Sequence, residues 1–246
     1  MDESTNKFNY STPVAIVLAG LIIAAAVFYG NPKADEPITT NPEKLEISKF
    51  VPVGPTDHVQ GDAKAKLAIV EYSDLECPFC KIFHKSMKEI MADKSVSASW
   101  TFRHFPIESL HSKAKNEAIA AECATVQGNH EAFWKYIDEI FKVTPSNNNL
   151  AETELPLIAS QIGLNVGTFN KCLTDQATVS RINADYDSAI EIGVDGTPFV
   201  LVIKGNTAYP IFRYKSIDDI PDNDVKTLAE KIIKAYEKNI TEAQSQ

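Results

Sequence analysis

The sequence predicts an α/β fold in which a strand–helix–strand unit, a block of helices and a strand–strand–helix unit follow one another. An apolar, β-branched run at Leu67–Ser73 is typical of a buried strand. Apolar residues then recur at helical spacing through most of the region from 113 to 192. Near the C-terminus, two strand-like runs flank the turn Lys204–Asn206 and precede a further helical segment. No internal repeat is present, so we expect one α/β domain with a helical insertion.

The first unit extends from residue 67 to residue 105. After the strand at Leu67–Ser73, apolar residues at helical spacing predict a helix over 78–92. Alternating apolar residues then predict a second strand over 97–105. Two strands joined by a helix normally lie parallel with a right-handed crossover, so we expect these two strands to be parallel neighbours.

The remaining elements are separated by clusters of turn-forming residues at Gly128, Pro145–Asn149, Gly163 and Gly193–Pro198. Acidic residues between 218 and 224 are suited to cap the last helix. The expected elements are helices at 113–127, 131–141, 152–161, 166–173 and 177–192, strands at 199–203 and 208–214, and a final helix at 222–239.

An apolar segment lies close to the N-terminus. No charged residue occurs from Phe8 to Pro32, and Val14–Tyr29 is almost entirely apolar. Its length is at the lower edge for a membrane-spanning helix, which needs about 20 residues. An uncleaved anchor is favoured over a cleaved signal peptide, because cutting at Ala24–Ala26 would leave apolar residues on the mature end. A buried core helix is the third alternative.

The next segment is rich in proline. Five of the 13 prolines fall within 31–65, so an extended tether is expected there, with an edge strand near Glu46–Val51. The folded part should start near Lys66. The predicted division is a membrane anchor at 1–30, a tether at 31–65, a main domain at 66–110 and 177–246, and a helical insertion at 111–176.

The composition excludes several classes of protein. The 246 residues are 44% hydrophobic and 23% charged, which provides a core and argues against a wholly disordered chain. The formal net charge is −9 and no basic stripe is present, so a nucleic-acid partner is not expected. The four cysteines are too few for a disulfide-built scaffold of this length.

Two of the cysteines stand three residues apart, in Cys77-Pro78-Phe79-Cys80, between the first strand and the first helix. A cysteine at a helix N-terminus meets unpaired N–H groups and the positive end of the helix dipole, which stabilise a thiolate. Proline suits the first helical position because its missing N–H is not needed there. Cys77 is therefore the candidate nucleophile and Cys80 the resolving cysteine. The alternative is half of a zinc site, but no second such pair exists, and no metal or cofactor is expected.

The order of elements and the C-P-x-C motif resemble the DsbA-like thiol–disulfide oxidoreductases, which have a thioredoxin-like fold with a helical insertion. The resemblance covers 67–239 and includes Gly193–Phe199, Ala121–Trp134 and Phe169–Leu173. It implies that Pro198 follows a cis peptide bond and faces the active cysteines.

The resemblance also assigns roles to individual residues. Thr197 and Pro198, together with Pro78 and Phe79, are expected to bind substrate, with the backbone of Thr197 pairing with an extended peptide. Glu71 is expected to be a buried proton carrier. The alternative for Glu71 is an ordinary strand residue, and for Pro198 an ordinary turn.

Cys123 and Cys172 lie on apolar faces of two predicted helices. They could be buried free thiols. The resemblance instead favours a structural disulfide between them, because some relatives carry such a bridge at matching positions.

The resemblance implies an extracytoplasmic enzyme that introduces disulfides into reduced, unfolded exported proteins and is reoxidised by a membrane quinone-linked partner. We expect a monomer, anchored by its N-terminal helix, or a secreted or periplasmic protein if the segment is cleaved. The alternatives are a disulfide isomerase or reductase and a non-enzymatic thiol- or zinc-binding module. One departure is Phe79, where strongly oxidising members commonly carry histidine, so a milder oxidant is expected.

Overall fold

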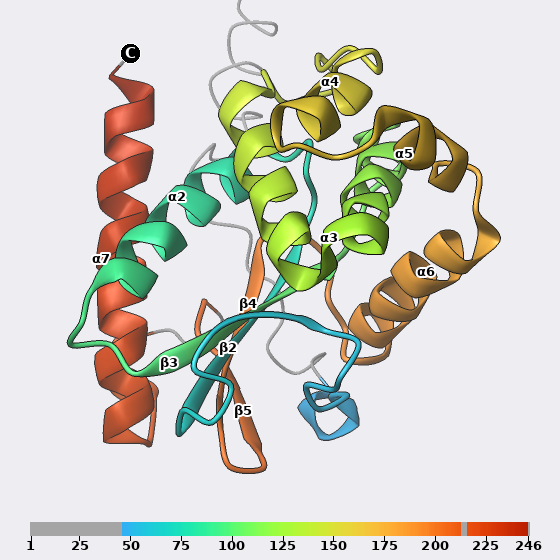
Figure 1. The fold of residues 1–246 in the computed structure, drawn as a ribbon. Helices are drawn as coiled ribbons and strands as arrows, with labels where there is room; N and C mark the ends of the chain where they lie inside the picture. Colours follow the sequence, from blue (N-terminus) through green and yellow to red (C-terminus); the bar gives the residue numbers. More distant parts are fainter. Residues whose placement is uncertain (1–45, 213–215, 246) are drawn as a thin grey trace, which may run out of the picture. The chain divides into compact units, whose positions relative to one another are not determined.

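The computed structural model describes residues 46–212 and 216–245, all within one unit spanning Asn41–Gln246 (Figure 1). Its five-stranded sheet has the order β1-β3-β2-β4-β5. The central strand β2 is parallel to β3, as expected of strands joined by a helix, and antiparallel to β4. The strands are β1 His58–Gly61, β2 Leu67–Ser73, β3 Ala98–His104, β4 Phe199–Lys204 and β5 Thr207–Pro210.

Helices cover both faces of this sheet, because successive strand side chains point to opposite sides. One face packs against α2, α3 and α7 through Ile69, Trp100, Phe102, Val200 and Val202. The other packs against the end of α6 and the residues after it through Val70, Tyr72, Phe199 and Leu201. Figure 1 shows α2 and α7 side by side on the left of the view, with α3 to α6 grouped together on the right. The helices are α2 Pro78–Ala92, α3 Ala114–Val143, α4 Glu154–Gln161, α5 Val166–Cys172, α6 Gln176–Glu191 and α7 Asn223–Gln244, with short 3₁₀ helices η2 Ile47–Lys49 and η3 Ile217–Asp219.

The helical insertion is built around α3. Two helices predicted at 113–127 and 131–141 form this one long element, which is kinked where Gly128 and Asn129 leave helical φ/ψ values. A disulfide joins Cys123 in α3 to Cys172 in α5. Asp222, from the acidic cluster, caps α7 by accepting hydrogen bonds from the N–H groups of Asp224 and Val225.

The sheet differs from the expectation at its N-terminal edge. The edge strand predicted near Glu46–Val51 is wrong, because that segment contains η2. The edge strand is β1, which lies inside the predicted tether and pairs antiparallel with β3. The described part of 31–65 is therefore packed against the domain. The other domain boundaries stay predictions.

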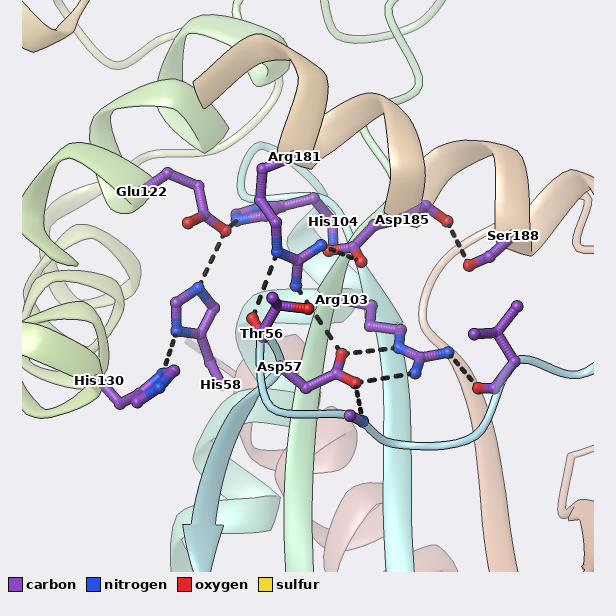
Figure 2. Close-up of polar contacts among 12 residues, drawn as sticks. Thr56, Asp57, His58, Arg103, His104, Glu122, His130, Arg181, Asp185 and Ser188 are labelled. Carbon is purple, nitrogen blue, oxygen red and sulfur yellow. Dashed lines mark hydrogen bonds and ion pairs between the residues drawn. The ribbon is translucent and has the colours of Figure 1, made fainter. Parts of the chain in front are cut away.

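Buried charges explain why this segment packs. Asp57 accepts two hydrogen bonds from Arg103 of β3, with Nε–Oδ1 at 2.9 Å and Nη2–Oδ2 at 3.0 Å (Figure 2). Beside it, His58 bonds Glu122 of α3 at 2.9 Å. Charged groups this deeply buried need partners, and these pairs provide them. The segment around Asp57 and His58 is thus held against β3 and α3 and is not a separate tether.

The predicted anchor at 1–30 lies outside the described residues. Within the part of the chain that the structure describes, no helix combines the length and the apolar character that a membrane span requires.

Candidate active site

The two cysteines of the C-P-F-C motif lie at the N-terminus of α2. Cys77 is the N-cap residue in an extended conformation, and Pro78 takes the first helical position. Cys77 is 4% exposed and Cys80 is fully buried, and both are free thiols. Phe79 between them is 53% exposed. The motif therefore presents one cysteine close to the surface and keeps the other inside.

The loop between α6 and β4 brings Thr197 and Pro198 to this helix end. The Thr197–Pro198 peptide bond is cis. The thiol of Cys77 donates to the carbonyl oxygen of Thr197 at 3.6 Å, across 120 residues of sequence. The fold thus places the two motifs that the sequence singled out against each other.

The pKa values of the two thiols are shifted in opposite directions. The hydrogen bond from the Cys80 thiol lowers the pKa of Cys77 to about 6, assisted by the side-chain hydroxyl of Thr197 and by the backbone N–H groups of Phe79 and Cys80, although burial opposes the shift. Burial, together with the neighbouring Cys77 sulfur and the Glu71 carboxyl, raises the pKa of Cys80 well above its ordinary value. At neutral pH Cys77 is therefore mainly a thiolate and Cys80 a thiol.

Glu71 lies on β2 with a fully buried side chain. Its Oε2 accepts a hydrogen bond from the indole N–H of Trp100 at 3.0 Å. Burial raises the pKa of Glu71 to about 8, and the charge of Cys77 adds to the shift. The carboxyl is therefore mostly protonated at pH 7, and it interacts electrostatically with both cysteines.

A cleft of about 530 Å³ borders the motif. It lies between α2, the end of α3, the loop that follows α3, and the end of α7. Its lining includes Pro78, Lys81, Phe141, Pro145 and Ser146. It gives a bound chain room beside Pro78.

The structure groups most of the residues singled out from the sequence. The cysteine pair, its two intervening residues and the Thr197–Pro198 loop adjoin one another, while Cys123 and Cys172 form their disulfide in the insertion. Sequence reasoning missed Trp100 as a donor to Glu71, because that bond joins strands whose register was not known. It also missed Tyr236 of α7, whose hydroxyl donates to the Phe79 carbonyl at 3.5 Å. Among the described residues, no group of three or more His, Cys, Asp or Glu could hold a metal ion.

Sequence comparison places this site in a family. The family profile described as thioredoxin matches residues 54–217, well over half of the chain. The chain belongs to the thioredoxin family. The thioredoxin-like fold with a helical insertion, predicted from the order of elements and the resemblance, is thereby confirmed.

Solved structures place this thioredoxin-family chain beside DsbA-type proteins. DsbA2 of Pseudomonas aeruginosa is 32% identical, and the match covers 64% of this chain and 86% of DsbA2 with a TM-score of 0.54. Alpha-DsbA1 of Wolbachia pipientis is 25% identical and covers 80% and 98% of the two chains, with a TM-score of 0.58. BdbD of Bacillus subtilis shares the fold, with 18% identity, coverage of 80% and 96%, and a TM-score of 0.54. The predictions of a DsbA-like protein and of an enzyme of the disulfide oxidoreductase class are confirmed.

Curated relatives carry a different name. The Na(+)/H(+) antiporter NhaA 3 of Salinispora tropica is 34% identical over 157 residues, which are 63% of this chain and 23% of the antiporter. The antiporter NhaA of Herminiimonas arsenicoxydans is 31% identical over 76% of this chain and 28% of its own. The chain spans about a quarter of the length of these relatives. The antiport activity in their names is therefore a property of those longer proteins and is not assigned to this chain.

Proposed function

We propose that this protein catalyses disulfide formation in exported proteins by dithiol–disulfide exchange through Cys77 and Cys80. The observation that carries the proposal is the position of Cys77 at the N-terminus of α2, against the Thr197–Pro198 loop. The lowered pKa of Cys77 and the raised pKa of Cys80 agree with it. In the oxidised enzyme, a substrate thiolate attacks the Cys77 sulfur, the Cys77–Cys80 bond breaks, and Cys80 takes up a proton. A second substrate thiolate then attacks the substrate sulfur of the mixed disulfide and releases Cys77 as a thiolate, the better leaving group.

Glu71 is suited to supply the proton that Cys80 needs when it leaves. A thiol with a strongly raised pKa is a poor leaving group as a thiolate, so protonation makes its departure easier. The carboxyl of Glu71 is buried, mostly protonated at neutral pH, and interacts with the charge of Cys80. The same group accepts the proton when the dithiol is reoxidised.

The sequence and the resemblance support a proposed substrate and location. Reduced, unfolded exported proteins would lie extended along the Thr197 backbone and beside Phe79. The apolar segment within 1–30 would anchor a monomer to the membrane with its catalytic domain extracytoplasmic, or would be removed as a signal peptide. A membrane quinone-linked protein would return the Cys77–Cys80 pair to its disulfide.

The redox equilibrium of Cys77 and Cys80 tests the direction of electron flow. We expect the Cys77–Cys80 disulfide to oxidise reduced peptides. It should be a weaker oxidant than the disulfide of Pro-His relatives, because Phe79 offers no charge to stabilise the thiolate. The Phe79→His variant should shift the equilibrium with glutathione toward the dithiol by about tenfold, or about 30 mV. Phe79→Tyr is the matched aromatic control and should not shift it.

Equilibration with glutathione, followed by thiol alkylation, measures this constant. Assays of insulin reduction and of scrambled-disulfide repair should be run beside peptide oxidation. A wild-type protein that reduces insulin readily and leaves a reduced peptide unoxidised would exclude the oxidase in favour of the reductase or isomerase.

The Glu71→Gln variant tests the proton carrier. Glutamine keeps an acceptor for Trp100 but carries no acidic proton, so turnover at pH 7 should fall by about 100-fold, as for loss of a general acid. The raised pKa of Glu71 also predicts that wild-type stability falls as pH rises from about 4.3, the unfolded value, toward about 8. Glutamine should remove the contribution of Glu71 to this slope and leave that of Glu117, a second buried carboxyl whose pKa is raised. Stopped-flow exchange and urea unfolding across this pH range measure both effects, and unchanged turnover would rule out the proposed role.

A further inference from the structure

Two buried carboxyl groups lie beside the active-site turn. Glu76 directly precedes Cys77, and its side chain is fully buried. Glu117 of α3 is 2% exposed. Oε1 of Glu76 and Oε2 of Glu117 are both buried without a hydrogen-bond donor from the described residues. Two carboxyl groups in such a place satisfy each other when one proton lies between them, and repel when both are ionised.

The acidity of Glu117 agrees with a shared proton. Burial and the hydrogen bond to Glu76 raise the pKa of Glu117 to about 10, and the charge of Asp74 adds to this shift while that of Lys113 opposes it. Asp74 itself is held by His111, whose Nδ1 lies 2.9 Å from its Oδ2. Glu117 is thus a neutral acid at physiological pH and can donate to Glu76.

Glu76 in turn holds the loop that follows α3. Its carbonyl oxygen accepts from the N–H of Asn147 at 2.9 Å, and its Oε2 accepts from the N–H of Asn148 at 2.6 Å. Ser146, Asn147 and Asn148 all have positive φ values, of 64°, 54° and 65°. Such a run of non-glycine residues persists only where the surroundings fix it. The bonds to Glu76 are part of what fixes it here.

The same loop forms a wall of the cleft beside the cysteines. Pro145 and Ser146 line the cleft together with Pro78 and Lys81. The Lys81 ammonium donates to the carbonyl oxygen of Thr144 at 2.6 Å, so the start of the loop is tied to α2 as well. The position of this wall therefore depends on the residue that precedes the nucleophilic cysteine.

We propose that Glu117 and Glu76 form a proton-sharing carboxyl pair that positions the loop 144–149 as the wall of a peptide-binding cleft beside Cys77. Both are positioning residues, because they act through the loop and do not touch the reacting sulfur atoms. The role of the cleft in binding substrate rests on the proposed function. The position of the loop does not, and it can be measured without activity.

The Glu117→Leu and Glu117→Gln variants test the pair. Leucine leaves the Glu76 carboxylate without its donor, whereas the glutamine amide can still donate to it. Glu117→Leu should raise KM for a cysteine-containing peptide by about tenfold with kcat unchanged, the effect of one unpaired buried oxygen. Glu117→Gln should keep both constants. Exchange with glutathione, which is too small to need the wall, should be the same in all three proteins.

One further measurement and one control variant make the outcome decisive. Hydrogen exchange of the Asn147 and Asn148 amides in the full chain should accelerate in Glu117→Leu and stay slow in Glu117→Gln. The Ile158→Val variant, in α4 of the insertion, is the control for a general loss of stability and should change neither KM nor these amides.

Each other outcome of these experiments contradicts a specific part of the proposal. Slow amide exchange in Glu117→Leu would overturn the positioning role. Fast exchange with unchanged KM would overturn the role of the wall in binding, and equal damage in Glu117→Gln would overturn the shared proton. A wild-type protein that oxidises no peptide would contradict the proposed function. Amide exchange would still show whether the carboxyl pair positions the loop.

Discussion

Replacing Cys77 by serine is expected to reduce disulfide transfer to a reduced test peptide to the uncatalysed rate. A serine oxygen cannot form the Cys77–Cys80 bond that the substrate attacks, so no oxidising equivalent remains. The loss should be complete at every pH, unlike the graded effect of Glu71→Gln. Peptide oxidation followed by mass spectrometry measures the product directly.

The Cys80→Ser variant separates the roles of the two thiols. Cys77 then lacks its resolving partner, so the variant should accumulate a mixed disulfide through Cys77 when it is incubated with an oxidised peptide. The reactive thiolate should also persist, because the serine hydroxyl can still donate a hydrogen bond to it. A Cys80→Ala variant removes the donor that lowers the pKa of Cys77 most, so in that variant the pKa of Cys77 should rise. Alkylation rates across pH 4 to 9 would show this shift as a displaced midpoint.

The matched control uses the other two cysteines. The double variant Cys123→Ala/Cys172→Ala removes the disulfide between α3 and α5, whose partners are 49 residues apart. It should lose about 4 kcal/mol of unfolding free energy in the chain-entropy account and keep its exchange activity. Oxidation of the peptide at a normal rate by Cys77→Ser would defeat the proposed mechanism. Loss of exchange by a folded double-alanine variant would show that the disulfide serves more than stability.

The elements around the motif could be predicted because their signals are local. The strand Leu67–Ser73 and the helix 78–92 appear in the structure with the expected bounds, since β-branched content, apolar spacing and Pro78 all act within a few residues. The position of Cys77 at the helix N-terminus follows from the same local rules. The candidate nucleophile could thus be named before its surroundings were known.

The interactions that tune this site could not be predicted, because they join distant parts of the chain. Trp100 reaches Glu71 from the neighbouring strand, and Glu117 reaches Glu76 from the insertion. Glu76 stands beside Cys77 in the sequence, yet nothing local distinguishes it from an exposed acidic residue before a helix. Its burial depends on how α3 and the loop after it pack.

The edge strand β1 was missed for a related reason. It has only four residues, too few to show clearly the alternation of apolar and polar residues that is typical of a strand. It is extended because it pairs with β3. The prolines around it predict an extended chain but say nothing of what that chain contacts. The contact depends on Asp57 and on Arg103, 46 residues later.

The Asp57→Asn variant is expected to lower the free energy of unfolding by about 3–5 kcal/mol, the usual effect of breaking a buried ion pair. Arg103 is 2% exposed and lies under the rings of Phe50 and Tyr72, so its charge has no access to water once the carboxylate is lost. Arg181, 3.8 Å from Asp57, would lose a neighbouring anion as well. Urea unfolding at pH 7 measures the difference.

The pH dependence distinguishes the ion pair from a packing defect. Burial would raise the pKa of Asp57, but the hydrogen bond and charge of Arg103 outweigh it and hold the pKa below the ordinary value. The stabilisation is therefore complete above about pH 4, the unfolded value, and is lost as pH falls through the lower folded value. The difference between wild type and Asp57→Asn should stay constant above pH 4 and shrink below it.

Two further variants complete the test. Asp62→Asn alters an exposed carboxylate in the same segment, whose contact is the N–H of Lys64, and should change stability little. The double variant Asp57→Leu/Arg103→Met replaces both charges with apolar groups and should recover much of the loss, because the penalty arises from the unpaired charge and not from the missing attraction. If the double variant is as unstable as Asp57→Asn, the hydrogen bonds from Arg103 to the Val51 and Pro52 carbonyl groups hold β1 in place, and the ion pair does not.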